Sequence, residues 1–355
     1  MEARSYGAAM GLGALLVAGC GGSPGTVRIA AERVTTSPYT LPLASGAGDL
    51  SHGLRLKVSI GGGRDKGVEI DTGSRGLVVA RGAVGSAAKD TGQSGSIEYT
   101  SDGLRLKGEY FLTPVTFHSS SGDVSTVPIR VLGVESSSCD PAYPKCRPDR
   151  SVDGVGVLGV GYKQYASLRG QPTAEINPFL QVQAMADGSL PRGYIIERTG
   201  VTLGLTTAAA ASFTFMALQP PAGGSKLPGD WGPAPACFTF PDRPPARPYC
   251  GSMLFDTGIG SMIIGLPPAQ RPAGLATQIP TGTRITIAAP GSGDPVLGYT
   301  AAIGVASDPL APQGDPAARW SAAGPFVNTG RHVLAGFDYA FDAAGGRIGF
   351  RTHRS

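Results

Sequence analysis

The tripeptide Asp-Thr-Gly occurs in two matching settings, and this repeat constrains the fold more than any other feature of the chain. The two copies are Ile70-Asp71-Thr72-Gly73-Ser74 and Phe255-Asp256-Thr257-Gly258-Ile259, one in each half of the sequence. An apolar residue precedes each copy, and an apolar run follows it, Leu77 to Ala80 in the first half and Met262 to Ile264 in the second. This pattern is typical of a tight turn between two strands. It predicts two related strand-turn-strand units that each bring one carboxylate to a shared site.

A third copy shows that the tripeptide alone is weak evidence. Because the chain is rich in glycine, roughly 0.2 copies are expected by chance. Asp90-Thr91-Gly92 lies between Ala87-Ala88-Lys89 and Gln93-Ser94-Gly95, without an apolar run on either side. We therefore expect an ordinary polar turn there, with no strand entering or leaving it.

Length and composition favour two β lobes. The chain has 355 residues, which is enough for two domains of ordinary size. It holds 54 glycines and 30 prolines, and only 16% of its residues are charged. Such a composition suits many short strands joined by tight turns and not helical bundles. The net charge is +4 without a basic cluster, so nucleic-acid binding is not expected.

Local patterns place the expected elements. Residues 54–60 alternate apolar and polar side chains as a half-buried strand does, and Gly61-Gly62-Gly63 ends that strand with a turn. Residues 96–117 read as a long hairpin with its turn at Ser101-Asp102-Gly103. A helix is expected from Asn177 until just before Gly188, and a proline-rich loop region is expected around residues 220–248.

The N-terminus has the pattern of a secretion signal. Arg4 gives a positive start, and residues 10–19 are apolar but too few to span a bilayer. The segment Val17-Ala18-Gly19-Cys20 resembles the lipobox of bacterial lipoproteins, in which the cysteine is acylated after cleavage. This resemblance implies a signal peptide over residues 1–19, a lipid-anchored flexible tether over 20–50, and a periplasmic or cell-surface location. A plain signal peptide with an incidental cysteine is the alternative.

The other four cysteines form two close pairs, one in each half. They are Cys139 and Cys146, then Cys237 and Cys250. Both pairs lie in segments rich in proline or glycine, so disulfides that close local loops are expected in an oxidising compartment. Zinc binding is the alternative. It is disfavoured because no pair has two-residue spacing and the four histidines are scattered.

The chain from about residue 53 to its end resembles the pepsin-like aspartic peptidases. Besides the paired motifs, Asp153-Gly154 with Val157-Leu158-Gly159 looks like the family element that supports the first catalytic loop. Tyr99 falls on the hairpin that would be the flap, and residues 330–350 look like the closing strands, beginning with a Gly-led strand. The resemblance implies an all-β, bilobal fold. Residues 51–205 would form the N-terminal lobe, with the first catalytic aspartate and the flap, and residues 206–355 the C-terminal lobe with the second aspartate.

The resemblance also implies roles for single residues. Asp71 and Asp256 would share one proton and activate a water molecule. Tyr99 would cover the substrate, although a strand tyrosine of this kind can also be a cross-strand packing residue. The supporting residues of the two loops would be Thr72, Gly73, Ser74, Thr257 and Gly258. No cofactor and no metal are implied. A monomer acting on polypeptide in extended conformation is expected.

Two departures from the family pattern bear on function. Ile259 follows the second motif where a hydroxyl residue is usual, and its side chain cannot donate a hydrogen bond to Asp256. We therefore expect a dyad whose first ionisation is less acidic, with activity nearer neutral pH. Val78 stands where a tryptophan often supports the flap tyrosine.

The leading hypothesis is a lipid-anchored aspartic endopeptidase. The alternative is a non-catalytic protein of the same fold that binds a peptide or another polymer between its lobes. Ile259 and Val78 favour that alternative, whereas two intact motifs oppose it, because a pure binder has no need of two mutually repelling carboxylates. A processing peptidase with one native target is a third hypothesis.

Overall fold

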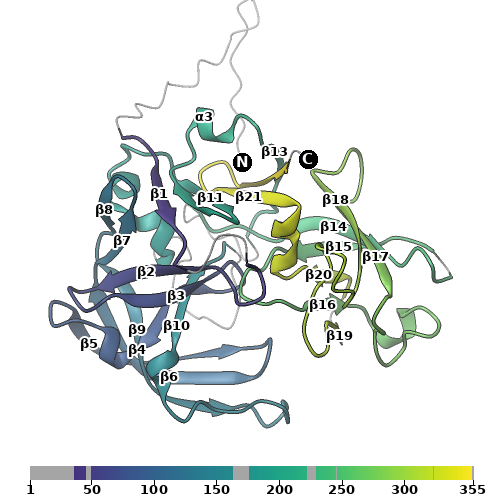
Figure 1. The fold of residues 1–355 in the computed structure, drawn as a ribbon, viewed down its shortest axis with the longest axis horizontal. Helices are drawn as coiled ribbons and strands as arrows, with labels where there is room; N and C mark the ends of the chain where they lie inside the picture. Colours follow the sequence, from purple (N-terminus) through teal and green to yellow (C-terminus); the bar gives the residue numbers. More distant parts are fainter. Residues whose placement is uncertain are drawn as a thin grey trace, which may run out of the picture. The chain divides into compact units, whose positions relative to one another are not determined.

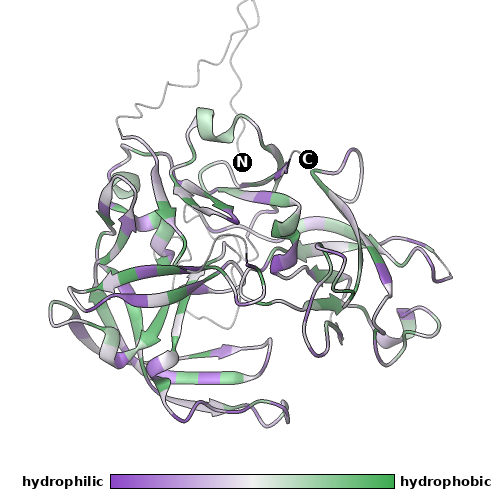
Figure 2. Ribbon diagram, viewed as in Figure 1, coloured by the Kyte–Doolittle hydropathy of each residue, from purple (hydrophilic) through white to green (hydrophobic). Residues whose placement is uncertain are grey.

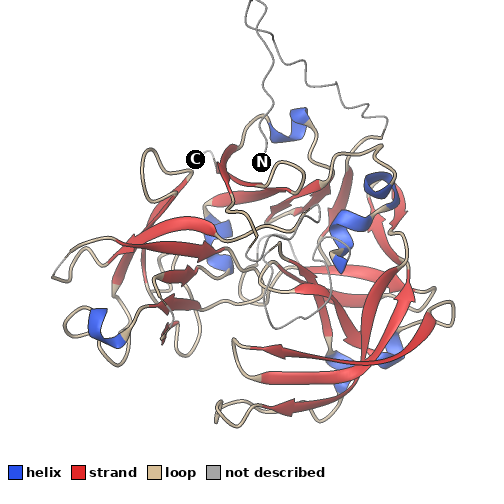
Figure 3. Ribbon diagram, turned by 180° about the vertical axis from the view of Figure 1, so that it is seen from behind, coloured by secondary structure: helices blue, strands red, loops and turns tan. Residues whose placement is uncertain are grey.

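Figure 1 shows the fold as a computed structural model, which describes residues 36–44, 49–162, 176–221, 229–244, 246–322 and 324–353. Strands dominate these residues and helices are few and short (Figure 3). The helical turns are η1 Arg81–Ala83, η2 Val152–Gly154, η3 Pro178–Gln181, α2 Gln183–Ala186, α3 Thr207–Ala210, η4 Pro268–Gln270 and η5 Arg331–Ala335. The predicted all-β class is confirmed. Within these ranges no helix has the length and apolar character needed to cross a membrane.

Three sheets make up the described part of the chain. The nine-stranded sheet has the order β5 (Lys89–Tyr99), β6 (Leu104–Thr113), β9 (Ile129–Cys139), β4 (Arg75–Ala80), β10 (Gly156–Val160), β3 (Lys66–Asp71), β2 (Arg55–Ile60), β7 (Val115–Ser119) and β8 (Gly122–Ser125). The seven-stranded sheet has the order β18 (Leu297–Ala302), β17 (Arg284–Ala289), β14 (Ala234–Thr239), β15 (Tyr249–Leu254), β20 (Phe326–Asn328), β16 (Met262–Gly265) and β19 (Ala318–Ser321). Each of these sheets therefore contains one of the two matching Asp-Thr-Gly motifs, at the end of β3 and just after β15.

The third sheet combines strands from both halves of the sequence. Its six strands have the order β1 (Tyr39–Pro42), β12 (Gly200–Leu203), β11 (Gly193–Glu197), β21 (Phe337–Asp342), β22 (Arg347–Thr352) and β13 (Thr214–Ala217). The lobe division predicted after residue 205 falls between β12 and β13, both members of this shared sheet.

Strand β2 shows why the local pattern predicted the first lobe well. Leu56, Val58 and Ile60 are buried, whereas the residues between them lie on the other face, as the period of two requires. Figure 2 shows hydrophobic and hydrophilic residues alternating along several strands. The predicted turn after β2 is confirmed, because Gly61 and Gly62 have φ of 56° and 72°, values that favour glycine.

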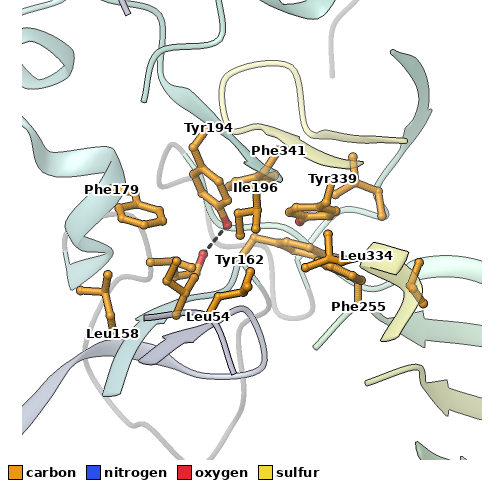
Figure 4. Close-up of a cluster of buried hydrophobic side chains, with 14 of the residues drawn as sticks. Leu54, Leu158, Tyr162, Phe179, Tyr194, Ile196, Phe255, Leu334, Tyr339 and Phe341 are labelled. Atoms are coloured by element: carbon orange, nitrogen blue, oxygen red, sulfur yellow. Dashed lines mark hydrogen bonds between the residues drawn. The ribbon is translucent and has the colours of Figure 1, made fainter. Parts of the chain in front are cut away.

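Figure 4 shows part of a buried hydrophobic cluster to which both halves of the chain contribute. The six-stranded sheet contributes Tyr194 and Tyr339, and the Tyr194 hydroxyl donates to the Val160 carbonyl at the end of β10 (2.6 Å). Phe255, the residue before the second aspartate, stacks on Tyr339 with ring centroids 4.5 Å apart. Burial of each side chain of this size stabilises the folded state by roughly 1.5–3 kcal/mol. Ile70 and Phe255, the residues before the two aspartates, both belong to this cluster, so both motifs are anchored in it.

The continuous helix predicted from Asn177 is wrong. The Asn177 side chain does cap the segment by accepting from the Phe179 amide (3.0 Å), but η3 ends at Gln181 and α2 begins at Gln183. Val182 between them is extended (ψ 143°), is fully buried and forms a bridge to Thr126. A buried β-branched residue with a strand partner therefore overrides the helical pattern.

Two segments predicted without strands contain them. Tyr39–Pro42, assigned to the flexible tether, form β1, which pairs with β12 and buries Leu41. Ala234–Thr239, inside the predicted proline-rich loop region, form β14, which pairs with β15 and β17. Strand β1 has only four residues and its partner β12 is distant in sequence, whereas β14 contains Pro235, so local composition does not indicate either strand.

The expectation that no strand enters or leaves the third Asp-Thr-Gly copy is also wrong. Asp90, Thr91 and Gly92 lie within β5, where the pairing with β6 shifts register between Asp90 and Ser94. The Gly92 amide donates to Asp90 Oδ1 (2.7 Å), so the tripeptide forms a bulge in the strand. This part of β5 is largely exposed, which explains why it lacks the apolar alternation of a half-buried strand.

Candidate active site

The first motif is a loop held between three strands. Asp71 ends β3, and β4 begins at Arg75. Strand β10 pairs in parallel with β3 and antiparallel with β4, and Gly159 lies opposite Asp71. The Gly161 amide donates to the Ser74 carbonyl (2.8 Å). The Val157-Leu158-Gly159 element therefore lies beside the first loop, as the sequence comparison implied.

The second motif repeats this arrangement with β15, β16 and β20. Strand β20 pairs in parallel with β15 and antiparallel with β16, placing Asn328 opposite Leu254. Gly330 follows, with φ of 67°, and a β-carbon there would contact the carbonyls of Ser261 and Ile259. The Gly-led strand predicted after Gly330 is wrong, because Arg331–Ala335 form η5. The closing strands are β21 and β22, which are antiparallel neighbours.

Thr72 and Thr257 lock the two loops together. The Thr72 amide donates to Thr257 Oγ1 (3.1 Å), and the Thr257 amide donates to Thr72 Oγ1 (3.0 Å). Each hydroxyl also donates to the backbone of the opposite strand, Thr72 to the Phe255 carbonyl (2.6 Å) and Thr257 to the Ile70 carbonyl (2.7 Å). All of these atoms are buried, so the four bonds fix the relative position of the two aspartates.

The two carboxylates face each other across the loop glycines. A β-carbon at Gly73 would collide with the Asp256 carboxylate, and one at Gly258 would collide with the Asp71 carboxylate. Both aspartates are buried, with 7% of Asp71 and 6% of Asp256 exposed. Glycine at both positions therefore permits an approach of two acidic groups that no other residue would allow.

Each carboxylate has its own set of donors. Asp71 accepts from the amides of Gly73 (2.7 Å) and Ser74 (3.2 Å) and from the Ser74 hydroxyl. Asp256 accepts from the Gly258 amide (2.9 Å), and its Oδ2 accepts from Asn328 Nδ2 (2.6 Å). Asn328 thus supplies a side-chain hydrogen bond where Ile259 cannot. Sequence reasoning considered only the position of Ile259 and missed Asn328.

The environment favours one proton on the pair. Burial raises the pKa of Asp256, the negative charge of Asp71 raises it further, and the pKa reaches about 8. The hydrogen bonds from Asn328 and Gly258 act in the opposite direction. Two buried carboxyl groups this close cannot both ionise cheaply, so they titrate as a unit.

A further acidic group, Glu69, lies near the dyad and was not predicted. Glu69, two residues before Asp71 on β3, forms an ion pair with Arg331 of η5 (3.0 Å) and a longer one with Arg55 (3.5 Å). Burial raises the pKa of Glu69, whereas Arg331 lowers it. Glu69 lies in the nine-stranded sheet and Arg331 in η5 of the second half of the chain, so their pair adds a second tie between the two halves.

A cavity of about 1190 Å³ opens over the dyad. Its lining includes Asp71, Asp256, Tyr99, Ile259 and Arg319, and it therefore receives residues from both halves of the chain. A cavity of this size accommodates several residues of an extended peptide.

Tyr99 reaches this cavity from the predicted hairpin, whose turn between β5 and β6 is confirmed. Its side chain packs against the buried cluster that contains Val78, Leu106 and Leu132. Its hydroxyl is buried and has no hydrogen-bond partner in the described ranges. Burial raises the pKa of Tyr99, and the charge of Asp71 raises it further. Tyr99 is therefore both a packing residue and a polar group near the dyad.

The cysteine pairs form the expected disulfides, Cys139–Cys146 and Cys237–Cys250. The first closes a loop beside the hairpin tip, where the Tyr143 hydroxyl donates to the Thr100 carbonyl (2.9 Å). The second joins neighbouring residues of β14 and β15. Cys20 lies outside the described residues.

Comparison with known proteins agrees with this geometry for the first half of the chain. A search among curated proteins found no match. Residues 41–216 match the family model described as the PE-PGRS C-terminal aspartyl peptidase-like domain. The matched segment contains Asp71 and Tyr99 and ends before Asp256. This part of the chain is therefore similar to an aspartyl peptidase-like domain.

Proposed function

We propose that this protein is an aspartic endopeptidase that hydrolyses peptide bonds with the Asp71–Asp256 dyad. The observation that carries this proposal is the pair of buried carboxylates facing each other over Gly73 and Gly258. The buried hydrogen bonds of Thr72 and Thr257 support it, because they maintain this geometry without a bound ligand.

The different surroundings of the carboxylates suggest their roles. Asp256 holds the shared proton, since burial and the charge of Asp71 raise its pKa to about 8. Asp71 takes a proton from a water molecule held between the two groups, and that water attacks the carbonyl carbon of the substrate. Asp256 donates its proton to the carbonyl oxygen. Collapse of the tetrahedral intermediate breaks the C–N bond: a proton from Asp71 goes to the departing nitrogen, and one hydroxyl of the intermediate returns its proton to Asp256 as the new carboxyl group forms. No covalent enzyme intermediate is needed.

The substrate that fits this proposal is a polypeptide in extended conformation. The cavity receives side chains from both lobes, and Tyr99 lies at its border on the hairpin. We propose that this hairpin closes over the peptide and helps to exclude water. The Tyr99 hydroxyl, which has no partner among the described residues, would then donate a hydrogen bond to the substrate.

We also propose that the protein is a bacterial lipoprotein at the periplasmic side or the cell surface. The Val17-Ala18-Gly19-Cys20 segment supports this location, as do the two disulfides, which form in oxidising compartments. Mass spectrometry of the expressed protein should find an acylated Cys20 at a new N-terminus. An unmodified cysteine, or cleavage elsewhere, would contradict this location.

Peptide-library cleavage by the full-length chain from pH 3 to 8, in mild detergent, tests the peptidase function. Wild-type protein should cleave, and Asp71→Asn and Asp256→Asn should each lose cleavage while remaining folded, since each keeps a side chain of the same size. Cleavage that survives in either variant would refute the dyad. A folded wild-type protein that binds peptides without cutting them would favour the non-catalytic alternative.

A further inference from the structure

Arg319 is directed into the cavity by the alternation of strand β19. This strand is at the edge of the seven-stranded sheet, and Arg319 pairs with Ile263 of β16, which also lines the cavity. Its neighbours Ala318 and Trp320 face the other way, where Ala318 is buried and Trp320 packs on Phe240 at 5.8 Å. The guanidinium therefore projects over the cavity and not into the core.

The guanidinium bridges the cavity to the hairpin tip of the other half. Its Nη2 donates to the carbonyls of Thr100 (3.2 Å) and Ser101 (2.9 Å). The Thr100 carbonyl also accepts from Tyr143 of the disulfide loop, which fixes its position. Two hydrogen bonds use both protons of Nη2 and leave the protons of Nε and Nη1 available.

The positive charge of Arg319 has no carboxylate partner among the described residues. Besides the dyad, four acidic residues line the cavity. Glu69 pairs with Arg331 and Arg55, and Glu98 pairs with Arg105. Asp102 and Asp149 form no ion pair with a described residue, and neither is paired with Arg319. Backbone carbonyls carry only partial negative charge and do not neutralise a guanidinium. A cation held in place with unused donors on a cavity wall is suited to a carboxylate.

We propose that Arg319 is a specificity-determining residue that binds the carboxylate of an aspartate or glutamate in the substrate. This inference rests on the proposed function for its substrate class, a polypeptide. The carboxylate accepts from Nε or Nη1 while Nη2 retains the carbonyls of Thr100 and Ser101. One guanidinium thereby couples an acidic side chain in the cleft to a closed hairpin.

Peptide binding to a non-cleaving variant tests this role separately from catalysis. Fluorescein-labelled peptides are compared in pairs that differ by Glu or Gln at one position, scanned along the peptide. Affinity is measured by fluorescence anisotropy with full-length Asp71→Asn protein. The same series is repeated with Arg319→Met and Arg319→Lys added. Arg284→Met is the matched control, because Arg284 is an exposed arginine of the same sheet, outside the cavity, paired with Asp242.

At one position Glu should bind roughly tenfold or more tightly than Gln, the effect of a hydrogen bond to a charged group. The ratio should fall to about 1 in Arg319→Met, remain partly in Arg319→Lys and stay unchanged in Arg284→Met. Any of three results would overturn the inference. They are equal affinity for the Glu and Gln peptides at every position, a preference for Glu that survives in Arg319→Met, and no peptide binding at all. Wild-type cleavage without an acidic preference would overturn it while leaving the peptidase function standing. An acidic preference in binding without wild-type cleavage would instead refute the peptidase and retain this role of Arg319.

Discussion

Replacing Asn328 with leucine removes the side-chain donor to Asp256 while keeping a buried side chain of similar size. Asn328 Nδ2 donates to Asp256 Oδ2 at 2.6 Å, and this bond stabilises the ionised form of Asp256. Without it, the pKa of Asp256 should rise further above its already raised value of about 8. The proton should then stay on the dyad to a higher pH.

The size of the shift follows from the strength of the bond. A hydrogen bond to a charged group contributes about 1.5–3 kcal/mol. One pKa unit corresponds to about 1.4 kcal/mol, so Asn328→Leu should raise the pKa of Asp256 by about 1–2 units. In the proposed mechanism, activity depends on the proton of Asp256 and falls as the pH rises through this pKa. The alkaline limb of the kcat/KM profile should therefore move up by about the same amount.

The assay is the pH dependence of kcat/KM with one cleaved peptide, measured for wild type, Asn328→Leu and Thr300→Ala. Thr300 is an exposed residue of β18 in the same sheet and should leave the profile unchanged. Unfolding temperatures across the pH range show that each variant stays folded. An alkaline limb that stays in place in Asn328→Leu, or that moves to lower pH, would refute the assignment of Asn328 as the donor that tunes the dyad.

Three further predictions concern stability and the hairpin. Because Asp256 has a raised pKa, the folded state loses stability as the pH rises from the usual 3.8 towards about 8. Asp256→Asn should therefore stabilise the protein more at pH 9 than at pH 5. The difference in the free energy of unfolding, measured by calorimetry, should be at least about 1.4 kcal/mol, which corresponds to one pKa unit. Equal effects at both pH values would contradict this. Arg331→Met should lower the free energy of unfolding in urea by about 2–3 kcal/mol, because it leaves the largely desolvated Glu69 with only its longer ion pair to Arg55, and adding Glu69→Gln should restore most of the loss; no loss would show that the pair is not stabilising. Tyr99→Phe should leave the free energy of unfolding unchanged, since the buried hydroxyl has no partner in the described residues. It should lower kcat/KM roughly tenfold if the hydroxyl donates a hydrogen bond to the substrate. Unchanged kinetics would show that Tyr99 is only a packing residue.

Features set by local sequence were predicted well. Apolar and polar side chains alternate along strand β2, and the apolar ones are those that are buried. Gly61 and Gly62 mark the turn that ends this strand. The hairpin turn between β5 and β6 was located by Ser101-Asp102-Gly103. In each case the information lies within a few neighbouring residues, because strand periodicity and turn chemistry are local properties.

Features that depend on distant partners were missed. Asn328 reaches Asp256 only because β20 pairs with β15, and nothing near either residue indicates that pairing. The helix expected after Asn177 is interrupted at Val182 by a bridge to Thr126, which is remote in sequence. Sheet order and cross-chain hydrogen bonds are set by tertiary packing, so a local pattern cannot reveal them.

Hydrolysis in water enriched in ¹⁸O tests the central claim most directly. The dyad of Asp71 and Asp256 is proposed to deliver water straight to the substrate carbonyl. In a single turnover, mass spectrometry should find one ¹⁸O in the new C-terminal carboxyl of the cleaved peptide and none in either aspartate. Label in the side chain of Asp71 or Asp256 would show a covalent intermediate, and a folded protein that cuts no peptide would refute the peptidase itself.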